Sequence, residues 1–492
     1  MTLRALLAGE DVQVVRGPLD IDIHGLCVDS RKARPGDAFF ALSGARADGK
    51  AFARDAARAG AVAVVGDLEP IEGVTSVGVE EPRRALARAA ATLHGAPALA
   101  LVIAAVTGTN GKTTTTYLLE SIFAAAGWPA GLVGTTGARL SGELRRGELT
   151  TPGAPELYGL LAEMRDRGLK AVALEVSSHA LVQRRAWGLD SDVAIFTNLS
   201  HDHLDYHGTL EAYLDAKLML FDGRNGDHGR KPWTAVVNLD DEAAPQVLAA
   251  AERGGGARRT FGAAPAADVR IEAVEPRARG IAVRLLERGG SPVALDLPLL
   301  GRYNGWNAAG AYAAARALQL GPATIARGLS ATAGVPGRLE RVDRGQPFEV
   351  VVDYAHTPDA LRKALAAARE HATGRLLLVF GCGGDRDRAK RPAMGHVAAE
   401  EADEVWVTSD NPRSEDPAAI AREIVAGMEP REGRVVLDRR AAIAEAIARA
   451  LPGDLVLIAG KGHEVTQTIA DRVLPFDDRQ VAGELLAAGS AR

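Results

Sequence analysis

The sequence of 492 residues is short of cysteine and of long apolar runs. Its two cysteines, Cys27 and Cys382, lie far apart, which argues against a disulfide framework or a cysteine zinc site and fits a reducing cytosol. No stretch approaches the roughly 20 consecutive apolar residues that a membrane-spanning helix needs. The first residues, Met1-Thr2-Leu3-Arg4, do not open an apolar signal peptide. We therefore expect a cytoplasmic protein without a membrane span.

The chain also lacks a strong excess of charge. The net charge is -5, so there is no global electrostatic case for nucleic-acid binding. Charged residues make up 25% and hydrophobic residues 47%, as in ordinary globular proteins. Proline-rich linkers, low-complexity tracts and short-period repeats are not evident. A chain of this length exceeds a single core, and we expect three α/β domains, 1–97, 98–336 and 337–492.

The first two domains carry apolar runs of strand length. In 1–97, Asp37–Leu42 and Ala61–Val65 are predicted strands on either side of a helix at Ala51–Ala59, and Ala96-Pro97 is the expected linker. In 98–336 the predicted strands are Leu99–Val106, Ala171–Val176, Val193–Thr197 and Trp233–Asn238. Strands that alternate with helices at this spacing predict a mainly parallel, doubly wound sheet.

The loop at 107–114 is the strongest single motif. A buried strand runs into Thr107-Gly108-Thr109-Asn110-Gly111-Lys112-Thr113-Thr114, and a predicted helix follows from Thr113 to Ala126. Glycines let backbone N–H groups surround phosphate oxygens, and the helix N-terminus adds partial positive charge. Lys112 would neutralise phosphate charge and the Thr113 hydroxyl would ligate Mg²⁺. The spacing departs from the standard phosphate loop, because Thr107 stands where that pattern has its first glycine.

Two further sites in the central domain carry ligand-type side chains. Glu175 ends a buried strand at the same expected sheet edge as the phosphate loop, which favours a role at Mg²⁺. The stretch Asn198 to His207 holds His201, His203 and His207, and it invites a metal-hydrolase interpretation. The register fails, since Tyr206 stands where that pattern needs histidine, so we expect one histidine near Mg²⁺ or phosphate and the others in packing roles.

In the third domain, four predicted strands each run into a polar loop. The strands are Phe348–Val352, Leu376–Phe380, Val405–Val407 and Leu455–Ala459. Ligands of open α/β sheets bind beyond the carboxyl ends of strands. Arg386 and Arg413 in these loops suit a carboxylate and Glu464 suits an ammonium, which together fit a zwitterion such as an amino acid. The alternative is that these charges pair with one another.

Several motifs in one order resemble the Mur ligases over nearly the whole chain. They are the phosphate loop, Glu175-Val176-Ser177-Ser178-His179, Thr197-Asn198-Leu199 to His207, Gly301-Arg302-Tyr303-Asn304, Gly337-Arg338-Leu339-Glu340 and Asp353-Tyr354-Ala355-His356-Thr357-Pro358. The resemblance implies a UDP-binding domain, a central doubly wound ATPase domain and a C-terminal Rossmann-like domain.

The resemblance also implies roles for single residues, which are given by group. The residues implied to bind uridine are Ser30, Arg46, Ala47 and Asp48. Those implied to bind the muramoyl dipeptide are Thr150, Thr151, Ser177, Gln183 and Arg185. ATP binding falls to Gly108, Thr109, Asn110, Gly111, Lys112, Thr113, Thr114, Asn304, Arg338 and Asp353. The catalytic set is Lys112, Glu175, His203, Lys217 and Arg338. Metal binding falls to Thr113, Glu175, His203 and Lys217, the last as a carbamylated lysine. Binding of the amino acid falls to Arg386, Asp410, Asn411, Pro412, Arg413, Gly460 and Glu464.

The implied reaction joins meso-2,6-diaminopimelate to the D-Glu γ-carboxylate of UDP-MurNAc-L-Ala-D-Glu, with ATP and Mg²⁺, through an acyl phosphate. Asp410-Asn411-Pro412-Arg413 is similar to the signature of diaminopimelate-adding members, and Arg413 with Arg386 suits a distal carboxylate that lysine lacks. The alternatives are a lysine-adding member, another ligase of the superfamily such as a folylpolyglutamate or cyanophycin synthetase, a nucleotide-dependent switch, and a zinc hydrolase. The expected partners are small-molecule substrates, and we expect a monomer whose domains close on them.

Overall fold

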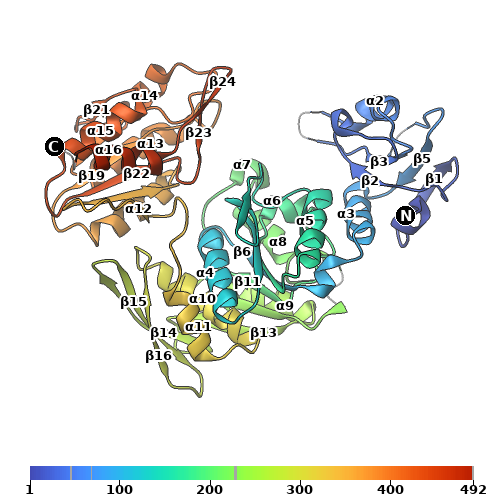
Figure 1. Cartoon of the computed structure of the whole chain (residues 1–492), viewed down its shortest axis with the longest axis horizontal. Coiled ribbons are helices and arrows are strands. Elements are labelled where there is room, and N and C mark those ends of the chain that lie inside the picture. Colours follow the sequence, from blue (N-terminus) through green and yellow to red (C-terminus); the bar gives the residue numbers. More distant parts are fainter. Residues whose placement is uncertain (45–46, 68, 227–229, 490–492) are drawn as a thin grey trace. The chain divides into compact units, whose positions relative to one another are not determined.

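The computed structural model describes residues 1–44, 47–67, 69–226 and 230–489 of the chain (Figure 1). By its internal contacts the chain separates into two compact units. The first unit consists of Met1–Ile271, Leu286–Ser291 and Trp306–Leu329, and the second of Glu272–Leu285, Pro292–Gly305 and Ser330–Arg492. Among the described residues, no helix is both long enough and apolar enough to cross a bilayer.

The N-terminal part of the first unit is a small α/β structure. Its strands have the order β1-β5-β4-β3-β2, and only the β1–β5 pair is antiparallel. The strands are β1 (Val12–Arg16), β2 (Gly25–Cys27), β3 (Asp37–Phe40), β4 (Ala63–Val65) and β5 (Thr75–Val79). The helices are α1 (Leu3–Leu6), α2 (Ala53–Arg58) and α3 (Pro82–Leu93), with short 3₁₀ turns η1 (Ser30–Lys32), η2 (Gly49–Phe52) and η3 (Pro97–Ala100).

The centre of the first unit is a sheet that is parallel over most of its width. The order is β13-β12-β11-β6-β10-β7-β8-β9, and only β7–β8 and β8–β9 are antiparallel. The parallel strands are β6 (Val102–Thr107), β7 (Ala130–Gly134), β10 (Ala171–Glu175), β11 (Val193–Phe196), β12 (Thr234–Asn238) and β13 (Ala257–Gly262). The hairpin strands are β8 (Gly137–Leu140) and β9 (Glu143–Arg145).

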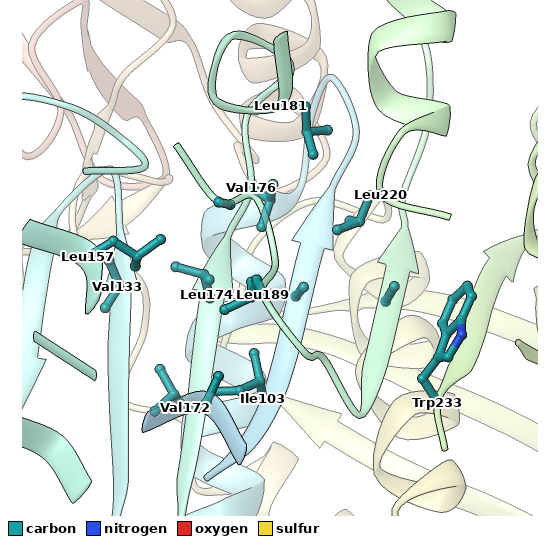
Figure 2. Packing of buried hydrophobic residues seen from close by; sticks show 14 of the residues in the cluster. Ile103, Val133, Leu157, Val172, Leu174, Val176, Leu181, Leu189, Leu220 and Trp233 are labelled. Atoms are coloured by element: carbon teal, nitrogen blue, oxygen red, sulfur yellow. The ribbon is translucent and has the colours of Figure 1, made fainter. Parts of the chain in front are cut away.

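Helices surround this sheet and bury its apolar strands. They are α4 (Lys112–Ala125), α5 (Ala154–Asp166), α6 (Ser178–Val182), α7 (Leu204–His207), α8 (Leu210–Leu218), α9 (Ala244–Arg253), α10 (Asn304–Ala317) and α11 (Pro322–Ser330). Ile103 of β6, Val172 and Leu174 of β10 and Leu157 of α5 belong to one fully buried cluster (Figure 2). The apolar core therefore fixes the strands whose carboxyl ends carry the predicted site residues.

The second unit contains most of the strands β14 (Val269–Arg277) and β15 (Gly280–Glu287), all of β16 (Pro292–Leu297), and a C-terminal sheet. That sheet has the order β17-β18-β22-β19-β20-β21. Its strands are β17 (Glu340–Arg341), β18 (Glu349–Asp353), β19 (Leu376–Phe380), β20 (Glu404–Val407), β21 (Arg434–Val435) and β22 (Leu455–Ala459). A separate hairpin consists of β23 (Thr466–Ile469) and β24 (Arg472–Pro475).

Helices cover both faces of the C-terminal sheet. They are α12 (Pro358–Arg369), α13 (Lys390–Glu401), α14 (Pro417–Ala426), α15 (Arg439–Arg449) and α16 (Asp478–Gly489). Leu376 and Leu378 of β19 pack with α12, α13 and α14, whereas Leu377 and Val379 pack with α15 and α16. Successive side chains of a strand point to opposite faces, so this alternation is that of a doubly wound sheet.

The predicted α/β class is confirmed, and three details differ. Leu99 lies in the turn η3 rather than in a strand, because Pro97 opens that turn, and β6 begins at Val102. Helix α4 begins at Lys112, one residue earlier than expected. The strands β14, β15 and β16 were not expected.

Candidate active site

The phosphate loop joins β6 to α4. Helix α4 begins at Lys112, and its N-cap Gly111 has φ +86°. A Cβ on Gly108 would lie 1.9 Å from Thr197 Oγ1, and one on Gly111 would lie 2.3 Å from Asn307 Oδ1. Only glycine allows these two close approaches. Lys112 Nζ donates to two loop carbonyl oxygens at 2.8 and 2.9 Å, so the ammonium lies against the loop at a helix N-terminus.

The residues after β11 hold the loop in shape. Asn110 N donates to Asn198 Oδ1 at 3.0 Å, and the Thr197 hydroxyl donates to the Asn110 carbonyl at 2.6 Å. Thr109 N donates to the Asn198 carbonyl at 2.8 Å. Thr113, in the first turn of α4, is buried. The predicted nucleotide residues of the first unit thus form one connected loop.

Glu175 lies at the same sheet edge, because it pairs with Val106 across β10 and β6. Its side chain is fully buried, and its two oxygens accept hydrogen bonds from Thr135 N at 2.9 Å and Thr135 Oγ1 at 3.0 Å. Thr135 Oγ1 also lies 3.1 Å from Thr150 Oγ1. The Thr151 hydroxyl donates to the Glu175 carbonyl at 2.8 Å. The predicted metal carboxylate and two predicted dipeptide residues therefore share one hydrogen-bond network.

Lys217 lies on α8 with almost no exposed surface. Its Nζ stands 4.0 Å from the centroid of the Tyr213 ring. Within the described residues it forms no ion pair with a carboxylate. Burial, and secondly the nearby Lys112 cation, hold the pKa of Lys217 well below its ordinary value of 10.5. A lysine with a lowered pKa is present as the neutral amine in a larger fraction of the protein molecules than a surface lysine is.

The histidines of the central domain pack as aromatic rings. The His179 ring centroid lies 4.2 Å from that of Tyr206, 4.9 Å from His203 and 5.4 Å from His207. His207 Nε2 lies 2.9 Å from Ser178 Oγ. In the part of the chain that the structure describes, no three His, Cys, Asp or Glu side chains come together as metal ligands. The geometry therefore offers no ligand cluster to the zinc-hydrolase alternative.

His179 is a site residue that sequence reasoning did not single out. Burial, followed by the charges of His203 and His207, lowers the pKa of His179 to about 4. His203 is the N-cap of α7, where it has φ +53°. His201 stands in the preceding loop with an exposed side chain.

Four of the predicted dipeptide residues also meet in this region. Arg185 donates to the Thr151 carbonyl at 3.0 Å and to Gln183 Oε1 at 2.6 and 3.0 Å. Ser177 N donates to Thr151 Oγ1 at 3.0 Å. Gln183 Nε2 donates in turn to the Tyr206 hydroxyl at 3.2 Å. Tyr206 therefore links the histidine-rich loop to this group, a role that no sequence signal indicated.

The predicted uridine residues lie in loops after two neighbouring parallel strands, β2 and β3. Ser30 is in the turn η1, and Ala47 and Asp48 are exposed. Asp48 accepts a hydrogen bond from Lys50 N at 3.1 Å. Arg46 lies outside the described residues.

The remaining predicted ATP residues belong to the second unit. Asp353 ends β18 and accepts hydrogen bonds from Leu339 N and Ala355 N, each at 2.8 Å. Burial raises the pKa of the Asp353 carboxyl. The Arg338 guanidinium lies 5.1 Å from the centroid of the Tyr354 ring. The side chain of Asn304 is buried, and its Nδ2 donates to the Leu300 carbonyl at 2.7 Å.

The predicted amino-acid loops meet within the second unit. Asn411 Nδ2 donates to Glu464 Oε2 at 2.8 Å, and a Cβ on Gly460 would lie 2.6 Å from Asp410 Oδ2. A Cβ on Gly383 would lie 3.0 Å from an Arg413 terminal nitrogen and 3.9 Å from Arg386 Cγ. The loops after β19, β20 and β22 thus converge, as the parallel register of these strands requires.

Two arginines of these loops, Arg386 and Arg413, differ in their contacts from the other charged residues nearby. Arg413 donates to the Gly384 carbonyl at 2.6 Å, and its backbone, at φ +52°, pairs with the β23 hairpin. In the described ranges, neither Arg386 nor Arg413 forms an ion pair with a carboxylate. Direct ion pairing within the loops is therefore not seen for these two arginines in the described residues. The pKa of the neighbouring Asp385 carboxyl is lowered chiefly by hydrogen bonds from Ser414, and the charge of Arg413 lowers it further.

Three buried polar side chains beneath these loops were missed by sequence reasoning. Arg439 and Asp478 form a fully buried ion pair at 2.7 Å. Arg439 also donates to the carbonyls of Ser409 and Ala459, which directly precede Asp410 and Gly460. Lys461 is fully buried and pairs with Glu464 at 3.1 Å. Lys461 stands inside a polar, glycine-rich loop, a setting that gives no sign of burial.

A close contact joins two of these loops. A Cβ on Gly337 would lie 2.1 Å from His463 N, and one on Gly462 would lie 2.7 Å from Tyr354 Cβ. Both glycines have positive φ, +66° and +52°. The backbone before Arg338 therefore touches the backbone of the amino-acid loop.

Comparison with known proteins gives matches along the whole chain. Three family models match it, "Mur ligase family, catalytic domain" at residues 22–107, "Mur ligase middle domain" at 106–315 and "Mur ligase, glutamate ligase domain" at 337–462. A protein of Solibacter usitatus is 44% identical over 469 residues, 94% of each chain, and one of Syntrophomonas wolfei is 43% identical over 491 residues, 99% of each chain. The chain belongs to the Mur ligase family.

The named relatives of this Mur ligase agree with one another. Both are called UDP-N-acetylmuramoyl-L-alanyl-D-glutamate–2,6-diaminopimelate ligase. A solved structure of the same name is 33% identical with a TM-score of 0.70, and the match covers 100% of this chain and 99% of that chain. This Mur ligase therefore has the three-domain α/β architecture of its family, and the predicted fold class and family are confirmed.

Proposed function

We propose that this Mur ligase is an ATP-dependent ligase that joins meso-2,6-diaminopimelate to the D-Glu γ-carboxylate of UDP-MurNAc-L-Ala-D-Glu. The observation that carries the proposal is the convergence of Arg386, Arg413 and Glu464 in the loops of the second unit, where neither arginine has an ion-pair partner among the described residues. Diaminopimelate presents a carboxylate and an ammonium at its distal end, which match these charges. The names of the full-length relatives support the same substrate.

In the first step the acceptor carboxylate attacks the γ-phosphorus of ATP, and ADP leaves. The phosphate loop supplies backbone N–H groups at the start of α4, and Lys112 supplies a cation for the charge that moves to the departing oxygen. The product is an acyl phosphate, whose phosphate is a far better leaving group than the original oxide. Thr151, Ser177, Gln183 and Arg185 support an acceptor site at the same sheet edge.

In the second step the amine of the amino acid attacks the acyl carbon. A tetrahedral intermediate forms, phosphate leaves with the bonding electron pair, and the nitrogen loses a proton. Arg386 and Arg413 hold the distal carboxylate, and the missing side chain of Gly460 lets the Asp410 carboxylate approach the loop of Glu464. Such a site favours diaminopimelate over lysine, because lysine lacks the distal carboxylate and so loses the charge-assisted contacts to both arginines.

Magnesium fits the donors of the first unit. Thr113, Glu175, His203 and carbamylated Lys217 would hold it, and the ion would neutralise phosphate charge during transfer. Lys217 suits carbamylation, since its lowered pKa and its lack of an ion-pair partner among the described residues leave a reactive neutral amine. The amine nitrogen then attacks the carbon of CO₂ and releases one proton, which turns a cation into an anionic metal ligand.

Phosphate release tests the proposed function. The purified protein is incubated with UDP-MurNAc-L-Ala-D-Glu, ATP and Mg²⁺, and meso-diaminopimelate or L-lysine is added in parallel. We expect release with diaminopimelate to be much faster than the slow release with lysine. Equal release with the two amino acids would overturn the assignment of Arg413, and no release with either would favour the nucleotide switch or another ligase of the superfamily.

The proposal includes a cytoplasmic, monomeric enzyme with domains at 1–97, 98–336 and 337–492, which close on their substrates. Light scattering during gel filtration tests the monomer, cell fractionation tests the location, and limited proteolysis tests the domain boundaries. Identical X-ray scattering with and without ligands would contradict closure.

A further inference from the structure

Lys461 lies beneath the amino-acid loops with no exposed surface. A lysine ammonium has three N–H donors and no acceptor. Its Nζ finds three acceptors, the Thr466 carbonyl at 2.6 Å, Glu464 Oε2 at 3.1 Å and Asn411 Oδ1 at 3.4 Å. All three donors of the buried cation are therefore used inside the protein, and none is left for a substrate.

The same contacts fix the direction in which Glu464 points. Its Oε2 accepts from both Lys461 Nζ and Asn411 Nδ2. Among the described residues, nothing donates to the second oxygen, Oε1, and the side chain is 33% exposed. One carboxylate oxygen is thus held from within, while the other is left for an incoming donor.

Asn411 is fixed in the same way. Its Oδ1 accepts from Lys461 and from Thr468 N at 2.9 Å, and its Nδ2 donates to Glu464. Thr468 in turn accepts a hydrogen bond from Arg413 N at 3.0 Å. Lys461 therefore lies at the centre of a buried network that joins the loop of Glu464, the loop of Asn411 and the β23 hairpin.

We propose that Lys461 is a positioning residue for selection of the amino acid. By holding Oε2 of Glu464 and Oδ1 of Asn411, its ammonium aims Oε1 of Glu464 at the distal ammonium of the substrate. Lys461 touches no substrate itself and acts through Glu464. This inference rests on the proposed function, and it assigns recognition of the distal ammonium to Lys461 and Glu464, separately from the arginines that recognise the distal carboxylate.

Three substrates separate these two parts of recognition. Diaminopimelate has both distal groups, 2-aminopimelate keeps the distal carboxylate without the ammonium, and L-lysine keeps the ammonium without the carboxylate. In Lys461→Met we expect kcat/KM for diaminopimelate to fall about 10- to 100-fold, the size of a lost charge-assisted contact. The value for lysine should fall by a similar factor, the value for 2-aminopimelate should stay within about threefold, and the KM for ATP should not change. Loss of preference for diaminopimelate over 2-aminopimelate is therefore the expected signature.

Further variants keep the test decisive. Lys363→Met removes an exposed lysine on α12 that pairs with Asp359 at the surface, and it should leave all three values unchanged. Lys461→Gln is slightly shorter and keeps a donor for Glu464, so a folded form should show an intermediate preference if Lys461→Met does not fold. In the Glu464→Gln background, Lys461→Met should add little further loss, because the two residues act on the same group.

Failure of the inference about Lys461 can be distinguished from failure of the proposed function. Equal losses for all three substrates in a folded variant would make Lys461 merely structural and overturn the inference alone, as would an unchanged preference. A wild-type enzyme that releases no phosphate with diaminopimelate would overturn the proposed function, and the inference with it.

Discussion

The buried ion pair between Arg439 and Asp478 makes a quantitative prediction for Asp478→Asn. Both side chains have 0% exposed surface, and two hydrogen bonds of 2.7 Å join them. Removing one partner of a buried pair leaves an uncompensated charge and costs about 3–5 kcal/mol. We expect the second unit to lose stability of that order, since the guanidinium of Arg439 is buried and would keep its charge without a carboxylate partner.

The chain offers a matched control on the same two helices. Arg440 of α15 and Glu484 of α16 form an ion pair of 2.8 Å with exposed fractions of 49% and 45%. Exposed pairs contribute about 0–1 kcal/mol, so Glu484→Gln should be nearly neutral. The two variants remove the same charge from the same helix and differ mainly in burial.

Hydrogen exchange followed by mass spectrometry measures this loss of stability in the full chain. Amides of β22 should exchange faster by a factor of about 10² or more in Asp478→Asn, since each tenfold change corresponds to about 1.4 kcal/mol. The KM for the amino acid should rise as well, because Arg439 also holds the carbonyls before Asp410 and Gly460. If Asp478→Asn and Glu484→Gln accelerate exchange equally, the reasoning from burial is refuted. The double variant Arg439→Met with Asp478→Leu should recover most of the lost stability.

Three further predictions concern acid stability, selectivity and Lys217. Arg391 holds the pKa of Glu415 at about 2, below its ordinary 4.5, so the pair's stabilisation is complete above pH 4.5 and is lost as the pH falls toward 2. In Glu415→Gln the melting temperature should decrease less steeply as the pH falls below 4.5. An unchanged pH dependence would contradict this cause. Arg413→Met should lower kcat/KM for diaminopimelate about 10- to 100-fold and leave lysine nearly unaffected, and a parallel loss for lysine would count against the carboxylate role. With ¹³C-bicarbonate, the protein should give a carbamate NMR signal that Lys217→Arg lacks, and the same signal in both proteins would place the carbamate elsewhere.

The sequence was sufficient for features that depend on short-range patterns. The phosphate loop, the parallel strands that end at Glu175, Phe380 and Ala459, and the convergence of the third-domain loops followed from apolar runs and from the rule that ligands bind at carboxyl strand ends. The start of β6 shows the limit of that pattern. The apolar run predicts a strand from Leu99, but it does not reveal the 3₁₀ turn that Pro97 opens.

The rest depends on contacts between residues far apart in the chain. Asn411 and Lys461 are 50 positions apart, and Arg439 and Asp478 are 39 apart, so no local pattern reports that they meet. A lysine next to two glycines is ordinarily solvated, and only the β23 hairpin and the loop of Asn411 enclose Lys461. Strands β14 to β16 were not predicted for a related reason. Their alternating polar residues resemble those of surface loops unless the strands with which they pair are known.

The close approach of Gly337 and Gly462 limits how the selectivity of this enzyme can be changed. Any side chain at either position would force two backbones apart, and one of those backbones leads directly into Arg338. A substitution or insertion that reshapes the loop from Gly460 to Glu464 would therefore disturb Arg338 and the proposed nucleotide site of the second unit as well. New amino-acid specificities are better sought at the Arg413 side chain, whose guanidinium donates to the Gly384 carbonyl and whose backbone pairs with the β23 hairpin.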